Sequence, residues 1–567
     1  MDKPDDSQAP PLMPGTQSPA APNAATPAAP GARLMLLDTT LRDGEQRVGV
    51  ALTANDKLRI ARRLDELGID YIEIGYPASN PRDRQVFEQL AAEPLLNSQV
   101  VAFGSTRHKE TDVAEDAGMQ ALAACPAGVV SIVGKSSVEQ VEKVLGTTTD
   151  ENLRMVADSI SYQRSQGKRV FFDAEHYFDA YEEDPGYALQ VVRTAIAAGA
   201  EMVVLCDTNG GSLPSQIYTV TAVTRHLLAE SSPEAGERVG IHCHNDSGVA
   251  VANSLEAVRA GCRQVQGTVN GYGERVGNTD LLVVLADLQL KMGYQLASVA
   301  QLAQLTEVSR FVAEIMNIAP DAHQPYFGSA AFSHKAGLHT SSVLRHKPSY
   351  EHVDPAAVGN FSRILVSELA GRAALASKAT ELGIDLPADA DDLARLLQQV
   401  KDRESQGFSY EVAEASLALF LADLTGQGEK CFELESFRVI TDKNADGRAT
   451  SEATIKLSVA GQRVVVTGEG VGPVNALDAA LRLAISRFYP EVESFELTDY
   501  KVRVLDEHTG TSAVTRVLID TSDGMRGWGT IGVSENIIEA SWEALVDSIA
   551  FGLLKAGALP QDKTLNE

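Results

Sequence analysis

Cysteine is scarce in this sequence of 567 residues and shows no paired spacing. The cysteines are Cys125, Cys206, Cys243, Cys262 and Cys431. An odd and scattered set argues against a disulfide framework and predicts reduced thiols, as in a cytoplasmic protein. Apolar runs of the roughly 20 residues that cross a bilayer are also missing, which argues against a membrane-spanning helix.

Positive charge is sparse: 49 lysines and arginines stand against 77 aspartates and glutamates, for a net charge of -28. A surface this acidic repels phosphate backbones and anionic lipid, so we expect neither a nucleic-acid nor a membrane partner. Residues 1–32 are rich in Pro and Ala, and they contain neither arginine nor the apolar core of a signal peptide. We expect them to form a disordered tail of a cytoplasmic protein.

The chain is longer than one hydrophobic core usually serves, so more than one domain is expected. From residue 33 onward, apolar strand-like runs recur, and most are followed by helical periodicity. The runs lie at 33–38, 70–75, 98–104, 119–125, 168–173, 201–206, 238–243 and 263–269. After the first run, TANDKLRIARRLDELG predicts a helix with Thr53 as N-cap and Gly68 as its stop. Eight such units predict an α/β fold with a TIM (β/α)8 barrel over 33–300, in preference to an open doubly wound sheet.

The pattern changes after the barrel. Residues 301–425 are mainly helical in pattern and are expected to form a linker region. Residues 426–557 hold a duplication: three strand-like runs and a helix, beginning at FELESFRVI, return in the same order from FELTDYKVRVL. Two βββα units placed after a barrel favour a dimerising or regulatory α+β domain, with a purely structural cap as the alternative. Residues 558–567 are expected to be a tail.

Polar residues gather at the predicted C-terminal ends of the barrel strands, where such barrels carry their active sites. His242 and His244 lie two apart on one strand, so their imidazoles point to the same face. Such a pair occurs both as a metal site and as packed or solvated histidines. Asp43, after the first strand, and Asn278, after the eighth, lie on neighbouring strands of a closed barrel. The four residues predict an open N2O2 site suited to Zn, Mn, Co or Mg.

Five segments carry a resemblance to a known family: LDTTLRDGEQ (37–46), VFFDAEHYFDAY (170–181), CDTNGG (206–211), HCHNDSGVAVANS (242–254) and VNGYGERVGN (269–278). Together they resemble the DRE-TIM metallolyases, and within them the isopropylmalate, homocitrate and citramalate synthases. The similarity runs from about residue 34 to 557, and the long citramalate type is the most similar, for example through GFSYEVAEAS (407–416). The loop IEIGYPASNPRD (72–83) departs from that type and is more similar to isopropylmalate synthases.

The resemblance implies a Claisen-type condensation of acetyl-CoA, the cosubstrate, with pyruvate, in the branch of metabolism that makes isoleucine. It implies a divalent metal ion (Mn, Mg, Co or Zn). The implied ligands are Asp43, His242, His244 and Asn278. Arg42 would bind the substrate and stabilise the alkoxide, and Thr208 would bind the keto-acid carboxylate. Glu175, His339 and Tyr350 would carry out acid–base catalysis.

The resemblance also implies a homodimer, with isoleucine as a feedback effector that binds the C-terminal domain. Other interpretations stay open. One alternative is a related synthase whose acceptor is 2-ketoisovalerate or 2-ketoglutarate. A second is an aldolase or lyase that shares the barrel. A third is a non-catalytic barrel that serves as an amino-acid sensor. Individually, Asp43 also fits a turn, Asn278 a helix N-cap and Arg42 an ion pair, while His339 and Tyr350 also fit a packing role.

Overall fold

The computed structural model describes residues 33–365, 372–387, 389–428, 430–443, 445, 447, 449–505 and 513–558. The predicted tail 1–32 lies outside these residues, as does all but the first residue of the predicted tail 558–567. The chain divides into two compact units: residues up to 331 together with 355–360, and residues 332–354 together with those from 361 onward. The domain boundaries inferred from the sequence stay predictions. Within the described segments, every helix is too short or too polar to cross a bilayer.

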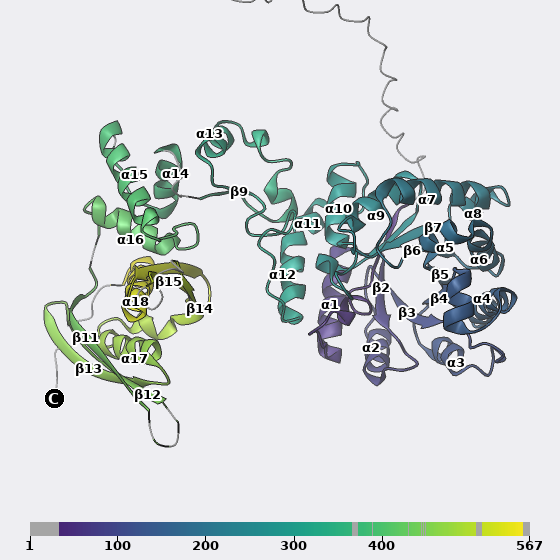
Figure 1. Ribbon diagram of the computed structural model, residues 1–567, viewed down its shortest axis with the longest axis horizontal. Helices are drawn as coiled ribbons and strands as arrows, with labels where there is room; N and C mark the ends of the chain where they lie inside the picture. The colour runs from purple at the N-terminus through teal and green to yellow at the C-terminus, as the bar shows by residue number, and fades with distance from the viewer. Residues whose placement is uncertain are drawn as a thin grey trace, which may run out of the picture. The chain divides into compact units, whose positions relative to one another are not determined.

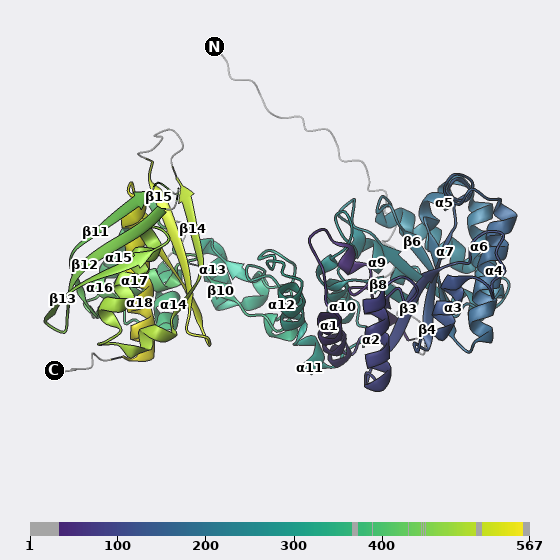
Figure 2. The ribbon, with the colours of Figure 1, turned by 90° about the horizontal axis from the view of Figure 1, so that it is seen from below.

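The described part of the first unit is a closed parallel barrel with strand order β1 to β8, which confirms the predicted fold class. The strands are β1 (Met35–Asp38), β2 (Tyr71–Gly75), β3 (Gln99–Ser105), β4 (Val129–Lys135), β5 (Arg169–Glu175), β6 (Met202–Asp207), β7 (Val239–Cys243) and β8 (Gln264–Gly267). Strand β8 pairs with β7 on one side and β1 on the other, so the sheet closes on itself. Figures 1 and 2 show the helices arranged around these strands.

Helices connect the strands and cover the barrel. They are α1 (Ala54–Leu67), α2 (Pro81–Ala92), α3 (Ala117–Ala124), α4 (Thr149–Ser165), α5 (Tyr177–Glu183), α6 (Pro185–Ala197), α7 (Pro214–Ala229), α8 (Pro233–Gly236), α9 (Ala250–Arg259) and α10 (Leu281–Leu290), followed by α11 (Val299–Leu302) and α12 (Leu305–Ile315). Helix α1 begins and ends as predicted: Thr53 forms a reciprocal capping box with Asp56, and Gly68 adopts a left-handed conformation with φ 88°.

The predicted fourth strand is wrong. Residues 117–124 form helix α3, and β4 is the next apolar run along the chain. The sequence AGMQALAA is dominated by good helix formers, and the Asp116 side chain caps it by accepting a hydrogen bond from the Met119 N–H. The run VVSIV is β-branched and forms the strand instead. Both runs are apolar, so hydrophobicity alone does not separate them.

Apolar side chains from six of the strands form a buried cluster inside the barrel. The buried cluster consists of Leu37, Tyr71, Val101, Val129, Phe171, Met202, Val204 and Cys206. Within it, the rings of Tyr71 and Phe171 meet edge to face with their centroids 5.1 Å apart. Polar chemistry is therefore expected beyond this cluster, at the C-terminal ends of the strands.

The second unit contains a helical part and the predicted duplication. The helical part holds β9 (Ser333–His334), α13 (Gly337–Arg345), β10 (Arg363–Ile364), α14 (Arg372–Leu382), α15 (Ala390–Ser405) and α16 (Glu414–Leu424). The first repeat is β11 (Glu433–Lys443), β12 (Ala449–Val459), β13 (Gln462–Gly470) and α17 (Pro473–Ile485). The second is β14 (Glu496–Val504), β15 (Thr515–Ser522), β16 (Gly527–Ser534) and α18 (Ile537–Ala556). Each repeat has its own antiparallel sheet, and one apolar core joins both repeats.

Candidate active site

Three of the four predicted metal ligands meet at the C-terminal end of the barrel. The Nε2 atoms of His242 and His244 lie 3.4 Å apart, and Oδ2 of Asp43 lies 3.3 and 3.9 Å from them. All three side chains are buried, and their ligand atoms lie within 4.8 Å of one another. Two imidazole nitrogens and a carboxylate oxygen therefore face a common point.

The topology of the barrel brings these residues together from distant parts of the sequence. His242 and His244 alternate with Cys243 along the end of β7, so that both imidazoles project to one side. Asp43 lies in a turn after β1, where its N–H donates to the carbonyl of Thr39 over 2.8 Å. Because β8 pairs with both β7 and β1, only one strand separates the two segments.

A series of side-chain hydrogen bonds orients the His242 ring from the side opposite Asp43. Its Nδ1 lies 2.9 Å from Oε1 of Gln266, whose Nε2 donates to Oδ1 of Asp173 over 3.1 Å. Ser131 donates to the other carboxylate oxygen of Asp173 over 2.8 Å. Because the Gln266 oxygen accepts, we assign the proton of His242 to Nδ1, which leaves the Nε2 lone pair facing Asp43.

Asn278 lies beside His244, to which it is joined by a β-bridge. Its Nδ2 donates to the carbonyl of Tyr272 over 3.2 Å. Glycine makes this loop possible: Gly277 has φ +101°, and a Cβ there would lie 2.0 Å from the carbonyl oxygen of Gly271. The tight turn brings the backbone of Asn278 beside that of His244.

The side chains present fit a divalent cation. Among the described residues, Oδ1 of Asn278 is buried without a hydrogen-bond partner. Burial alone would raise the pKa of Asp43, but Arg42, His242 and His244 outweigh it and hold this pKa well below its usual range. Burial, reinforced by His242, lowers the pKa of His244 to about 4, so its imidazole is neutral at pH 7. An anionic carboxylate and a neutral imidazole are the protonation states that metal binding requires.

Arg42 lies between the carboxylates of Asp43 and Glu73. Its Nε donates to Oε2 of Glu73 over 2.6 Å, its Nη1 lies 3.4 Å from Oδ2 of Asp43, and its guanidinium stacks on the Phe103 ring at 4.0 Å. Burial alone would lower the pKa of Arg42, but Glu73 and Asp43 raise it, so the guanidinium stays protonated. Burial raises the pKa of Glu73 to about 7, although Arg42 acts in the opposite sense.

Two further predicted residues lie at the same end of the barrel. Glu175 ends β5, and its register partner Lys135 ends β4, where the two side chains form an ion pair with an N–O distance of 2.5 Å. The chain then turns at His176, whose φ is +58° and whose N–H donates to Oγ1 of Thr208 over 2.8 Å. Since the Thr208 oxygen accepts this bond, its own proton is left to donate to a substrate.

Six of the predicted site residues, but not Asn278, line one cavity of about 210 Å³. Its lining residues include Arg42, Asp43, Tyr76, Phe103, Asp173, Glu175, Cys206, Thr208, His242 and His244. On one wall, the rings of Tyr76 and Phe103 meet edge to face with centroids 5.1 Å apart. The cavity therefore combines a cluster of charges with an aromatic wall.

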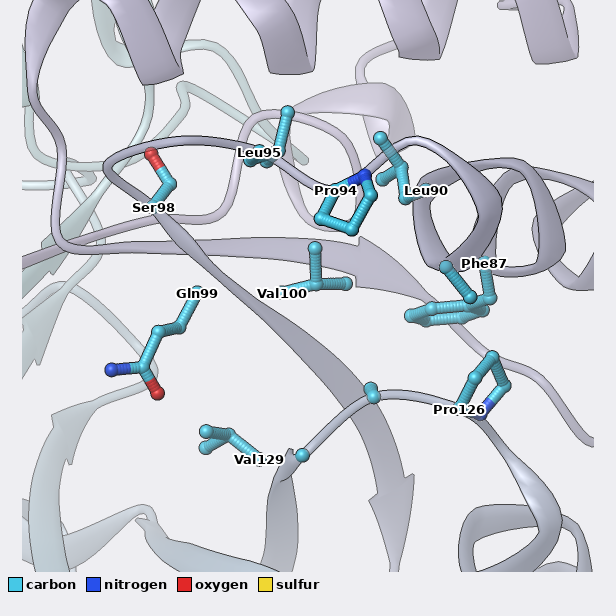
Figure 3. Close-up of a pocket in the computed structure, with 12 residues that line it drawn as sticks. Phe87, Leu90, Pro94, Leu95, Ser98, Gln99, Val100, Pro126 and Val129 are labelled. Carbon is cyan, nitrogen blue, oxygen red and sulfur yellow. The ribbon is translucent and has the colours of Figure 1, made fainter.

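A second cavity lies at the opposite end of the barrel, where β3 and β4 begin (Figure 3). Phe87, Leu90 and Val100 project into it, and none of its described lining residues is ionisable. Polar catalysis needs groups that bind or transfer protons and stabilise charge. The candidate active site is therefore the cavity at the C-terminal ends of the strands.

His339 and Tyr350 belong to the second unit. Their rings stack with centroids 4.1 Å apart and an interplanar angle of 28°, and Tyr350 is 45% exposed. The predicted acid–base roles of both residues stay predictions.

Several residues that shape the site were not predicted from the sequence. The sequence pattern does not predict the roles of Glu73, Lys135, Asp173 and Gln266, which lie within barrel strands β2, β4, β5 and β8. Glu73 is the middle residue of β2, and its contact with Arg42 becomes evident only in the folded barrel. A glutamine on β8 or a serine on β4 reads as an ordinary strand residue until the barrel closes.

Family models match nearly all of the described chain. An HMGL-like model matches residues 33–312, a homocitrate synthase post-HMGL domain-like model matches 327–407, and a LeuA allosteric (dimerisation) domain model matches 411–553. Together with the barrel and its buried Asp–His–His cluster, they define an HMGL-like enzyme that carries a LeuA-type domain.

Curated relatives narrow this class. The chain is 51% identical to (R)-citramalate synthase of Streptomyces coelicolor, over 93% of this chain and 98% of the relative. It is 49% identical to (R)-citramalate synthase of Synechocystis sp., over 92% and 96%. A 2-isopropylmalate synthase of Methanocaldococcus jannaschii is 31% identical, over 91% and 94%. The chain belongs to the (R)-citramalate synthase family.

Proposed function

We propose that this protein condenses acetyl-CoA with pyruvate and hydrolyses the thioester, which yields citramalate and free CoA. The observation that carries the proposal is the 51% identity to a citramalate synthase over 98% of its length, with Arg42, Asp43, His242 and His244 gathered around one small cavity. The aromatic wall of Tyr76 and Phe103 supports an acceptor with a small side chain, such as the methyl group of pyruvate.

Asp43, His242, His244 and Asn278 would hold a divalent ion such as Mn, Mg, Co or Zn. When bound, this ion polarises the keto group of the acceptor. The protein's own part is to keep Asp43 anionic and to fix His242 through Gln266, as described above. Thr208 donates its free proton to the acceptor carboxylate.

The reaction needs a proton to leave the methyl group of acetyl-CoA and a proton to reach the new alkoxide. Glu175, which contacts Lys135, is the candidate acid–base residue within the barrel, and His339 with Tyr350 is the candidate pair from the second unit. Arg42 has five N–H donors and uses one on Glu73, so others remain to stabilise the negative oxygen that forms as the carbon–carbon bond closes. Water then cleaves the thioester and releases the CoA thiol.

The LeuA-type domain suggests a dimer and an effector. We propose a homodimer that is feedback-inhibited by isoleucine, in a cytoplasmic pathway of branched-chain amino-acid synthesis. The mass of the particle in solution and the rate with and without isoleucine test these statements. A monomer, or a rate unchanged by any branched-chain amino acid, contradicts them.

Thiol release tests the reaction itself. Purified protein with acetyl-CoA, Mn²⁺ and separate 2-keto acids should release CoA fastest with pyruvate, and the product should be citramalate. The IEIGYPASNPRD loop makes 2-ketoisovalerate the main competitor, so faster turnover of that acid would convert the assignment to isopropylmalate synthesis. No CoA release with any keto acid would sink the condensation. His242→Ala serves as the control and should lose Mn²⁺-dependent turnover.

A further inference from the structure

A buried lysine lies between the two loops that form one side of the site. Lys57, in the first turn of α1, has a side chain with 0% exposure. Its Nζ contacts three oxygens: Oδ1 of Asp83 at 2.6 Å, Oε2 of Glu45 at 2.9 Å and the carbonyl of Ile74 at 3.0 Å. A lysine is almost never fully buried unless its charge is paired, so these contacts account for its position.

Glu45 connects this ammonium to the loop after β1. It lies in the short 3-10 helix Gly44–Gln46, directly after Asp43, and the Gln46 N–H donates to the Asp43 carbonyl over 3.0 Å. Its second oxygen, Oε1, lies 2.7 Å from Nη1 of Arg82. Both carboxylate oxygens of Glu45 therefore contact a cation, and these contacts anchor the segment that contains Arg42 and Asp43.

Asp83 connects the same ammonium to the loop after β2. Its Oδ1 contacts Lys57, while its Oδ2 accepts the Tyr76 N–H over 3.0 Å. The preceding Gly75 has φ +149°, and a Cβ there would lie 2.1 Å from Oδ2 of Asp83. This fit makes room for a close approach of the carboxylate to the backbone that carries Tyr76.

We infer that Lys57, Glu45 and Asp83 form a positioning cluster for the active site, here called the clamp. One arm, the Lys57–Glu45 contact, fixes the position of the Arg42–Asp43 segment. The other arm, the Lys57–Asp83 contact, fixes the position of Tyr76 in the cavity wall. Two cations, Lys57 and Arg82, balance two carboxylates, so the cluster is neutral as a whole. Neither arm touches the reacting atoms; each acts through the backbone of the loop that it holds. The selectivity part of this inference rests on the proposed condensation, whereas the metal part does not.

Isosteric variants separate the two arms. Glu45→Gln and Asp83→Asn each leave one acceptor oxygen where two are needed, so each weakens one arm and keeps its shape. Asp65→Asn is a matched control on the same helix: both Asp65 oxygens accept backbone N–H groups, from Leu96, Asn97 and Ser98 at the other end of the barrel. Lys57→Met releases both arms.

The readouts are the Kd of Mn²⁺ for metal-free protein, by calorimetry, and kcat and KM with pyruvate and 2-ketobutyrate. Glu45→Gln should raise the Mn²⁺ Kd about 10-fold or more, as loss of outer support for a ligand does. Asp83→Asn should shift the pyruvate to 2-ketobutyrate ratio of kcat/KM by about 5-fold or more, mostly through KM, with the Mn²⁺ Kd within about 2-fold of wild type. Lys57→Met should show both changes.

Asp65→Asn should lower the melting temperature and leave both readouts unchanged. If Glu45→Gln and Asp83→Asn behave in the same way, the clamp is only structural and the inference is overturned. Should Lys57→Met fail to fold, the two isosteric variants still decide. If the wild type releases no CoA with any keto acid, the proposed condensation fails, and the Mn²⁺ titration of Glu45→Gln alone decides the inference.

Discussion

The imidazole of His242 has one nitrogen turned toward Asp43 and the other toward Gln266. Replacing Gln266 by leucine removes the acceptor for Nδ1–H and frees the ring to rotate. We expect Gln266→Leu to weaken Mn²⁺ binding about 10- to 100-fold, the usual effect of losing such a partner. Calorimetric titration of metal-free protein measures it. Ser131→Ala, at the far end of the same chain of hydrogen bonds, should weaken Mn²⁺ binding less. Equal weakening in both variants would contradict the proposed role of Gln266 in orienting His242.

We expect Tyr76 to set the size of the acceptor in the proposed reaction. Its ring packs edge to face on Phe103 beside Arg42, so truncation opens space on that wall. We expect Tyr76→Ala to raise the 2-ketobutyrate to pyruvate ratio of kcat/KM about 10-fold, the order of discrimination that one methylene gives. Tyr71→Phe, in the apolar interior, is the control and should leave the ratio unchanged. A ratio unchanged in Tyr76→Ala would place the selectivity elsewhere.

Single residues differ in how far the sequence predicts them. Spacing on a strand is enough to pair His242 with His244, since alternate residues share a face. Lys57 could not be found in this way, because a lysine in an amphipathic helix normally lies at the surface. Its burial becomes evident only when α1 packs against the loops that contain Glu45 and Asp83.

Helix α18 carries an acid whose titration should be visible in the stability of the second unit. Burial raises the pKa of Asp547 to about 7, although a hydrogen bond from Ser416 over 2.6 Å acts in the opposite sense. An unfolded aspartate releases its proton near pH 4. Between about pH 4 and 7 the folded state therefore binds more protons, and this group lowers the free energy of unfolding as pH rises.

Asp547→Asn removes this dependence and can still accept the Ser416 hydrogen bond. Relative to wild type, the free energy of unfolding of the variant should be little higher near pH 4.5 and most increased at pH 8. A pKa difference of about three units between the folded and unfolded states sets an upper bound of about 4 kcal/mol on this increase. Partial exposure of the Asp547 side chain makes the increase smaller. Urea unfolding of both proteins at the two pH values measures the difference. A gain that is larger at pH 4.5 would contradict the assignment.

Elements are predicted well where pattern and caps agree. Helix α1 has both a capping box and a left-handed glycine, and its boundaries match the prediction. Helix α3 and strand β4 were confused because each is a short apolar run, and the deciding difference was β-branching. The duplicated repeats of the second unit were recognisable because the order of elements recurs, whatever the exact boundaries.

The molecule as a whole has two compact units with separate cores, so heat should unfold it in two steps. Mn²⁺ at about 100 times its Kd should stabilise the barrel transition by about 2.7 kcal/mol. Isoleucine should shift the other transition, and chelation of the metal should reverse only the first shift. Scanning calorimetry measures both transitions. In His242→Ala the Mn²⁺ shift should disappear while the isoleucine shift remains; one transition moved equally by both ligands would contradict this division.

The barrel closes where its last strand, β8, pairs with its first strand, β1, and this closure has a consequence for biosynthesis. Asp43 and His242 are about 200 positions apart, so a ribosome adding 5–20 residues per second makes them roughly 10 to 40 seconds apart. Until the seventh and eighth strands emerge, the nascent chain has one carboxylate and no imidazoles to offer a cation at this point. If the proposed site binds an ion, only a chain that has already made these late strands can offer it the carboxylate and both imidazoles together.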